Sequence, residues 1–150
     1  MIQKDALIID ALLGIGCDKP VQGIYLDIIN QINESGESIL SADIPSGLCA
    51  DSGKPLGSCV KQAHVLSFIT KKLGTVIGDS AQIINKLTID KLDIPEKIIN
   101  QIRSVYHVMN KSVLDPVIKK RANDAYKNQF GHILLVGSDS GYGGAIILAA

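Results

Sequence analysis

The sequence predicts an α/β fold built around a parallel sheet. Two apolar runs each end on a carboxylate that is followed by a glycine-bearing turn: residues 6–9 lead to Asp10, and residues 38–42 lead to Asp43. Between them lies a segment with apolar residues at helical spacing, which makes a strand–helix–strand unit. Because such units join parallel strands through a crossover of fixed hand, both carboxylates are expected at the carboxyl edge of one sheet. Open parallel sheets bind their ligands at that edge.

The first predicted strand covers residues 6–9, a continuous apolar run of the kind that is buried on both faces of a sheet. The loop after Asp10, residues 11–16, contains two glycines that allow a backbone to approach a ligand closely. A helix is expected over residues 21–34, with Gly36 ending it. Its apolar face consists of Ile24, Ile28, Ile29 and Ile32.

The second predicted strand, residues 38–42, ends in the motif DIPSGL at residues 43–48. Pro45 cannot donate a ladder hydrogen bond and stops the strand, while Gly47 tolerates the positive φ of a tight turn. The motif thereby holds Asp43 and the hydroxyl of Ser46 at the carboxyl edge. The same residue types also occur in ordinary turns, so a plain turn without a site is an alternative interpretation of this motif. Two carboxylates at one edge favour the interpretation as a site.

Further strands are predicted over residues 64–69 and, from mixed signals, within residues 83–89. The basic connector at residues 70–74 has two interpretations: a solvated loop, or a lysine that faces the same carboxyl edge. Pro95 is expected at the first position of a short helix that runs to residue 104. A domain boundary is expected near residues 106–112.

The last 20 residues predict a buried strand (131–137), a glycine-rich loop (137–144) and the start of an apolar helix (145–150). A strand, a glycine loop and a helix in this order aim backbone N–H groups at an anion. The spacing matches neither the Walker A pattern nor the dinucleotide-binding fingerprint, so a plain turn of small residues stays an alternative. Because an apolar helix cut after one turn has no partner, we expect the tail to be an incomplete domain.

Composition excludes several classes of partner. Fifteen positive and fifteen negative side chains balance, so no charge excess points to nucleic acid or to a membrane surface. Aromatic residues make up 4% and tryptophan is missing, which argues against stacking on bases. The odd number of cysteines without a C-x-x-C pair indicates reduced thiols, and no signal peptide or membrane-length apolar run is present. We therefore expect a cytoplasmic protein with a small-molecule partner.

Residues 5–95 resemble the second half of the NAD(P)H-hydrate epimerase domain. The resemblance rests on DALLGIG at residues 10–16, on DIPSGL at residues 43–48, and on DIP at residues 93–95. Residues from about 114 onward resemble the start of an ADP/ATP-dependent NAD(P)H-hydrate dehydratase domain. The matching residues there are Arg121, Lys127, Phe130, Gly131 and the segment 137–145. The two domains in this order are found in the bifunctional nicotinamide-nucleotide repair enzymes.

The resemblance implies a fold and a division of the chain. Residues 1–105 would be a partial epimerase domain, a Rossmann-like three-layer parallel sheet. Residues 106–150 would be a linker and the first strand, loop and helix of a ribokinase-like α/β domain. The chain is therefore expected to be an internal fragment that is inactive, or nearly so, by itself. A homo-oligomer is an option for the longer protein.

The resemblance also implies an activity. The reaction would interconvert the R and S hydrates of NADH or NADPH, and the dehydratase part would use ADP or ATP to return the S hydrate to NAD(P)H. Asp43 would be the substrate-contacting catalytic acid/base. Asp10 and Ser46 would bind a potassium ion, for which hard oxygen ligands are suitable. The substrate-binding positions would be Gly14, Ile15, Gly16, Cys17, Asp18, Lys19, Pro20, Asp43 and, in the dehydratase part, Ala145.

Two alternatives remain open from the sequence. An epimerase-like domain can serve as a non-catalytic binding or adaptor module, in which case Asp43→Asn would leave its function unchanged. A sugar-kinase relative is suggested by the tail alone, and would leave Asp10 and Asp43 without a role.

Overall fold

The computed structural model describes residues 4–102, 104–113, 115–116, 134–137, 139, 141 and 143–149. The chain divides into two compact units, Met1–His107 and Val108–Ala150.

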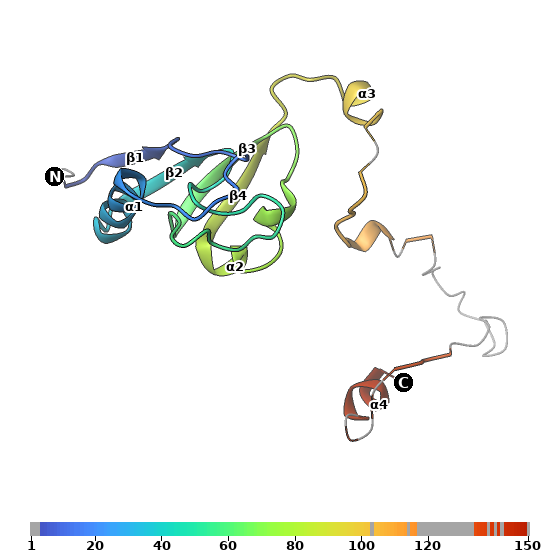
Figure 1. The fold of residues 1–150 in the computed structure, drawn as a ribbon. Coiled ribbons are helices and arrows are strands. Elements are labelled where there is room, and N and C mark those ends of the chain that lie inside the picture. The colour runs from blue at the N-terminus through green and yellow to red at the C-terminus, as the bar shows by residue number, and fades with distance from the viewer. Residues whose placement is uncertain are drawn as a thin grey trace. The chain divides into compact units, whose positions relative to one another are not determined.

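The first unit contains a parallel sheet of four strands in the order β1-β2-β3-β4 (Figure 1). The strands are β1 (Leu7–Asp10), β2 (Ser38–Ala42), β3 (Ala63–Phe68) and β4 (Ile84–Asp90), and each pairs in parallel with the next. The predicted α/β fold with a parallel sheet is therefore confirmed. All four carboxyl ends meet at one edge of the sheet, which we call the carboxyl edge.

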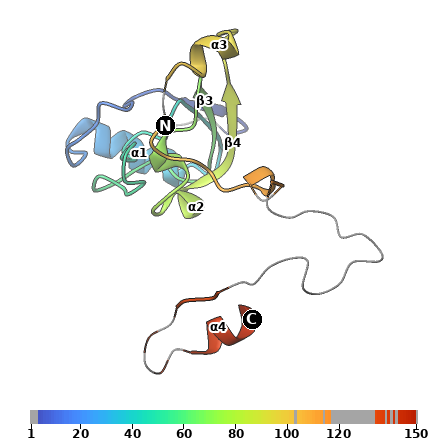
Figure 2. The ribbon, with the colours of Figure 1, turned by 90° about the vertical axis from the view of Figure 1, so that its right-hand side faces the viewer.

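Helix α1 (Ile24–Glu34) connects β1 to β2 and covers one face of the sheet (Figure 2). Its residues Ile29 and Ile32 are buried against Ile39 of β2 and Val60. Gly36 follows the helix with φ 73°, as the predicted stop requires. The prediction is wrong for Ile24, which is 68% exposed. The helix begins only at this residue, so its first turn does not reach the core.

The two ends of this helix give a matched test of core packing. Ile29→Ala is expected to lower the free energy of unfolding by about 2–5 kcal/mol, because a fully buried side chain leaves a cavity. Ile24→Ala is expected to change it by less than about 0.5 kcal/mol, because the side chain is mostly in water. Urea unfolding followed by circular dichroism measures both, and equal losses would contradict the assigned helix face.

Strand β1 is one of the two edge strands of the described sheet, and this corrects a second prediction. Leu7 and Ile9 are 62% and 66% exposed, so the strand is not buried on both faces. Only the alternate residues turn toward α1: Ile8 packs against the core cluster, and Asp10 is buried. The apolar run at residues 6–9 therefore does not mean that both faces of the sheet are covered at this strand.

Three short helical segments complete the described part of the first unit: η1 (Leu73–Thr75), α2 (Ser80–Ile83) and α3 (Glu96–Ile99). A further short segment, η2 (Lys111–Val113), belongs to the second unit. The predicted helix at residues 96–104 is thus only one turn long. Pro95 is its N-cap, with φ −58° and ψ 134°, rather than its first helical residue.

The second unit shows part of the predicted tail. Residues 134–137 are exposed and, within the described residues, pair with no strand, so a buried strand is not confirmed there. A ladder needs a neighbouring strand to accept its hydrogen bonds. Helix α4 (Gly144–Ala149) follows, as expected. Other predicted residues of the tail, including Arg121, Lys127, Phe130 and Gly131, lie outside the described residues.

Among the helices that the structure describes, none is long and apolar enough to cross a membrane. The three cysteines Cys17, Cys49 and Cys59 are free thiols. Burial raises the pKa of the Cys59 thiol to about 11.

Candidate active site

Asp10 ends β1 and forms the buried half of the candidate site. Its carboxylate is 1% exposed and accepts a hydrogen bond from the hydroxyl of Ser41, its register partner on β2, at 2.7 Å. The backbone N–H of Ser46 donates to the same oxygen at 2.9 Å. The hydroxyl of Ser46 donates to the other oxygen at 2.5 Å. These bonds tie the end of β1 to the turn after β2.

Ser46 also anchors the start of the glycine loop. The backbone N–H of Leu13 donates to the Ser46 hydroxyl at 2.9 Å, and the carbonyl oxygen of Leu13 lies 3.2 Å from the same oxygen. Three kinds of oxygen therefore gather here: a carboxylate, a hydroxyl and a carbonyl. We call Asp10, Leu13 and Ser46 the oxygen cluster.

The oxygen cluster fits a potassium ion in its donor chemistry. An ionised carboxylate has about four acceptor positions, of which Asp10 uses three, and a hydroxyl has two, of which Ser46 uses one. Lone pairs thus remain on Asp10 and Ser46, and hard oxygen donors suit a hard cation. In the described part of the chain, no three or more His, Cys, Asp and Glu side chains gather in a way that would hold a metal.

Residues 14–20, the predicted substrate-binding loop, continue from this anchor. They are mostly exposed, with Cys17 half-buried, and Cys17 N–H donates to the carbonyl of Gly14 at 3.1 Å. The loop ends where Val21 N–H donates to the carbonyl of Leu56 at 2.8 Å. It is thus fixed at both ends and leaves the backbone between them open to solvent.

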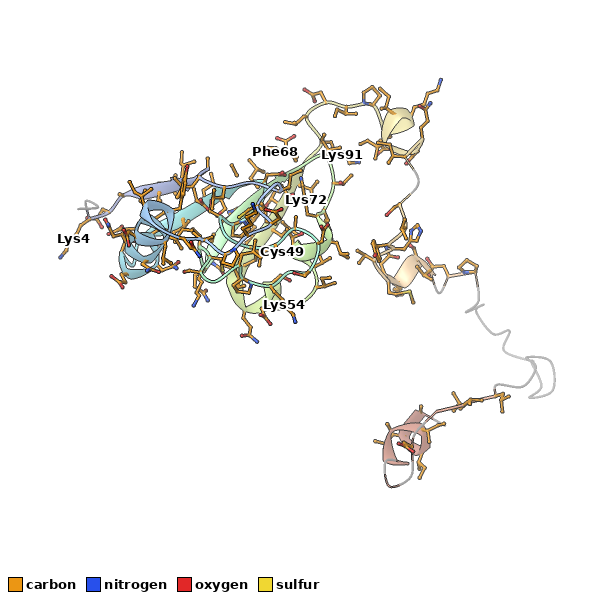
Figure 3. The ribbon with its side chains drawn as sticks, in the orientation of Figure 1. Lys4, Cys49, Lys54, Phe68, Lys72 and Lys91 are labelled. Carbon is orange, nitrogen blue, oxygen red and sulfur yellow. The ribbon has the colours of Figure 1, made fainter. Side chains whose placement is uncertain are left out.

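Asp43 follows β2 directly and forms the accessible half of the site. Its carboxylate accepts hydrogen bonds from the backbone N–H of Phe68 at 2.9 Å and from the hydroxyl of Ser67 at 3.3 Å. The ammonium of Lys72 contacts the same carboxylate oxygen. The side chains of Lys72 and Asp43 are 18% and 25% exposed, respectively. Figure 3 shows Phe68 and Lys72 at the carboxyl end of β3.

The contacts of Asp43 decide its protonation. Burial raises the pKa of its carboxyl group, but the Lys72 hydrogen bond, the Phe68 N–H, the Lys72 charge and the Ser67 hydroxyl together outweigh burial. The pKa therefore falls below its ordinary value. Asp43 is a carboxylate at neutral pH and faces water with part of its surface, so it can accept a proton from a ligand.

This lowered pKa has a consequence for stability. A carboxyl group with a depressed folded-state pKa stabilises the fold above its unfolded-state pKa, near 3.8, and this contribution is lost as the pH falls through the folded-state value. Asp43→Asn is therefore expected to lower the free energy of unfolding at pH 7 by about 1–3 kcal/mol. The difference from the wild type should shrink as the pH falls below 3.8 and be lost below the folded-state pKa. Urea unfolding at both pH values measures it, and a difference independent of pH would contradict the ion pair.

Some residues of this site were not singled out by the sequence. Ser41 and Ser67 are buried hydroxyls that hold Asp10 and Asp43, and Lys72 was not distinguished from Lys71. The sequence did contain a signal for Ser41, because it is a polar residue within an apolar strand. The structure then places it directly beside Asp10 in the register of β1 and β2. The lysine could not be chosen from sequence, because both lysines lie in the same loop.

Two further features lie elsewhere. Ala145, the predicted substrate-binding residue of the tail, is exposed on α4 of the second unit. A cavity of 390 Å³ lies at the opposite, amino edge of the sheet, among the first residues of the strands. Its lining includes Leu7, Ser38, Gln62, His64 and Asn85. No residue of the oxygen cluster and no contact of Asp43 lines this cavity.

The chain is similar to known proteins over its whole length. It is 34% identical over 150 residues to the bifunctional NAD(P)H-hydrate repair enzyme Nnr of Coxiella burnetii, which covers 100% of this chain and 31% of that protein. The protein of the same name in Vibrio cholerae is 35% identical over 148 residues, with 96% of this chain and 29% of the relative covered. The bifunctional NAD(P)H-hydrate repair enzyme of Leishmania braziliensis is 33% identical over 148 residues, with 96% and 26% covered.

The chain thus spans less than a third of the length of these relatives. The family model described as "YjeF-related protein N-terminus" matches residues 1–74. This match contains β1, α1, β2 and β3, together with Asp10, Ser46, Asp43 and Lys72. Over residues 1–74, which include these side chains, the chain is therefore similar to the family of YjeF-related protein N-termini.

Proposed function

We propose that this chain is part of a nicotinamide-nucleotide repair protein, and that its first unit carries part of an epimerase site. The site would interconvert the R and S hydrates of NADH or NADPH. The observation that carries the proposal is the placement of Asp43, an ionised and partly exposed carboxylate held by Lys72 at the carboxyl edge. The names of the relatives, which repair NAD(P)H hydrates, support the substrate class.

Asp43 would be the group that moves the proton. Epimerisation of a hydrated ring needs a proton to leave and to return, and a positioned carboxylate is suited to both steps. Removal of the hydroxyl proton by Asp43 would let the ring C–N bond break, which leaves an aldehyde and a nitrogen that receives the proton. Closure of the ring on the other face of the aldehyde would reform the C–N bond and return the proton to oxygen, so substrate and product have one composition. Residues 14–20 would bind the nucleotide, because this loop begins beside Ser46 and exposes its backbone at the same edge.

Asp10 and Ser46 would hold a potassium ion. When bound, the ion would supply a fixed positive charge near the substrate. Neighbouring residues would hold these two ligands in position. The hydroxyl groups of Ser41 and Ser46 donate hydrogen bonds to the Asp10 carboxylate, and the Leu13 N–H links the glycine loop to Ser46.

The second unit, with Ala145, would be the beginning of a dehydratase domain. In the complete protein that domain would use ADP or ATP to convert the S hydrate back to NAD(P)H. This part of the proposal rests on the similarity of nearly the whole chain to bifunctional relatives. Potassium, the second reaction and the choice between ADP and ATP are all parts of this proposal.

An epimerase assay of the native gene product tests the proposal. The purified R hydrate of NADPH is added, and the appearance of the S hydrate is followed by chromatography against the spontaneous rate. The proposal predicts equilibration much faster than the spontaneous reaction. Equilibration at the spontaneous rate would contradict it.

A further inference from the structure

Two neighbouring lysines follow β3, and the structure treats them differently. Lys71 is exposed to solvent. Lys72 is mostly buried, and its ammonium contacts the Asp43 carboxylate and donates to the carbonyl of Phe68 at 2.9 Å and to the hydroxyl of Ser67 at 3.2 Å. All three donors of this ammonium therefore have an acceptor, and the charged group has a single defined position.

The backbone around this ion pair is strained at two places. Asp43 has φ 68°, and Ile44 N–H donates to the carbonyl of Ala42 at 2.9 Å across it. At the end of the next strand, Ile69 has φ 67°, and Thr70 N–H donates to the carbonyl of Phe68 at 2.7 Å. Each is a three-residue γ-turn with a positive φ at its centre, which is the rarer and strained form.

Strain at Ile69 is costly, because a β-branched residue is seldom found at positive φ. Such strain persists only where the surrounding contacts fix it, and it is concentrated at functional sites. Here each turn serves the ion pair. The turn at Asp43 places this residue, and therefore its side chain, directly after the carboxyl end of β2. The turn at Ile69 follows Phe68, whose N–H donates to Asp43, and leads the chain on toward Lys72.

We propose that Lys72 is the positioning residue for Asp43, holding its carboxylate in one orientation and in the ionised form that accepts the proton. Ser67 assists, since its hydroxyl lies between both groups, 3.3 Å from Asp43 and 3.2 Å from Lys72. The inference rests on the epimerase function proposed above. Among the described residues, Lys72 is the charged group found in contact with Asp43.

The chain offers a matched control for this inference. Lys72→Met removes the ammonium but keeps most of the side-chain length, and Lys71→Met removes the neighbouring charge from solvent. Lys72→Arg keeps the charge with a different shape. Circular dichroism of each variant verifies that the fold is retained.

The first measurement is the titration of Asp43, followed by ¹³C NMR of the carboxyl carbon in the 150-residue chain. In Lys72→Met the pKa of Asp43 should rise, because burial then acts on it without the opposing charge. In Lys71→Met it should stay as in the wild type. An unchanged titration in Lys72→Met would overturn the inference, whether or not the chain is an epimerase.

The second measurement is epimerase kinetics of the native gene product. Lys72→Met should lower kcat by about a hundredfold through misplacement of the carboxylate, with little change in KM. Lys72→Arg should recover part of that loss. A normal kcat in Lys72→Met, with a wild-type enzyme that is active, would overturn the positioning role alone. An inactive wild-type enzyme would instead overturn the proposed function.

Discussion

Replacing Asp43 by asparagine is expected to lower kcat for hydrate epimerisation by about a hundred- to ten-thousandfold, the usual contribution of a positioned acid/base group. Asparagine has nearly the same shape and can still accept the hydrogen bond from Phe68 N–H. It cannot take up the proton. The loss should therefore appear in kcat more than in KM, measured with the native gene product and purified R hydrate.

Asp27→Asn is the control for this substitution. Asp27 is an exposed carboxylate in the first turn of α1 and is not among the contacts of Asp43, so its replacement removes the same charge without changing the surroundings of Asp43. Its kcat should match that of the wild type. Full activity of Asp43→Asn would contradict the catalytic role. It would instead favour the alternative of a non-catalytic binding or adaptor module.

Gly47→Ala is expected to have a large effect on stability, about 4 kcal/mol or more, which is much of the stability of a small domain. Gly47 has φ 86°, and a Cβ atom built there would lie 2.1 Å from the backbone carbonyl oxygen of Ser58. Relief would require movement of backbone. That movement would break the bond from Val60 N–H to the Ser46 carbonyl, 2.9 Å, and thereby disturb the oxygen cluster.

Gly57→Ala separates the two causes of this loss of stability, which are the left-handed φ and the steric contact of the added Cβ atom. Gly57 also has a left-handed φ, 81°, but a Cβ atom there would meet its nearest neighbours only at 3.8 Å. Alanine at Gly57 should therefore cost about 1–2 kcal/mol, from conformation alone. Urea unfolding compares the two variants. Similar losses for both would mean that the contact with Ser58 does not decide the stability of this turn.

The positions of Asp10 and Asp43 could be predicted from the sequence because they depend on local rules. Each apolar run ends on a carboxylate, and a helix of suitable length separates them. Parallel pairing of β1 with β2 then places both at the same edge, as the structure shows. The turn at Gly47 also followed from residue type, since glycine accepts the φ that this turn requires.

Other features depend on contacts between distant segments and could not be predicted. The choice of Lys72 over Lys71 depends on the turn at Ile69, whose positive φ has no signal in an isoleucine. The exposure of Leu7 and Ile9 depends on which faces of the sheet are covered, not on the strand itself. Ile24 shows the same limit for a helix: its spacing fits the apolar face, but the helix starts too late to bury it.

The most direct test is to locate the bound hydrate by hydrogen–deuterium exchange and mass spectrometry of the native gene product. Binding at the carboxyl edge predicts protection of peptides that contain residues 10–20 and 43–48 when the NADPH hydrate is added. Peptides from the amino-edge cavity, residues 36–39 and 62–64, should exchange as before. Protection confined to the amino-edge peptides would contradict the assignment of Asp43 and the oxygen cluster to the substrate site.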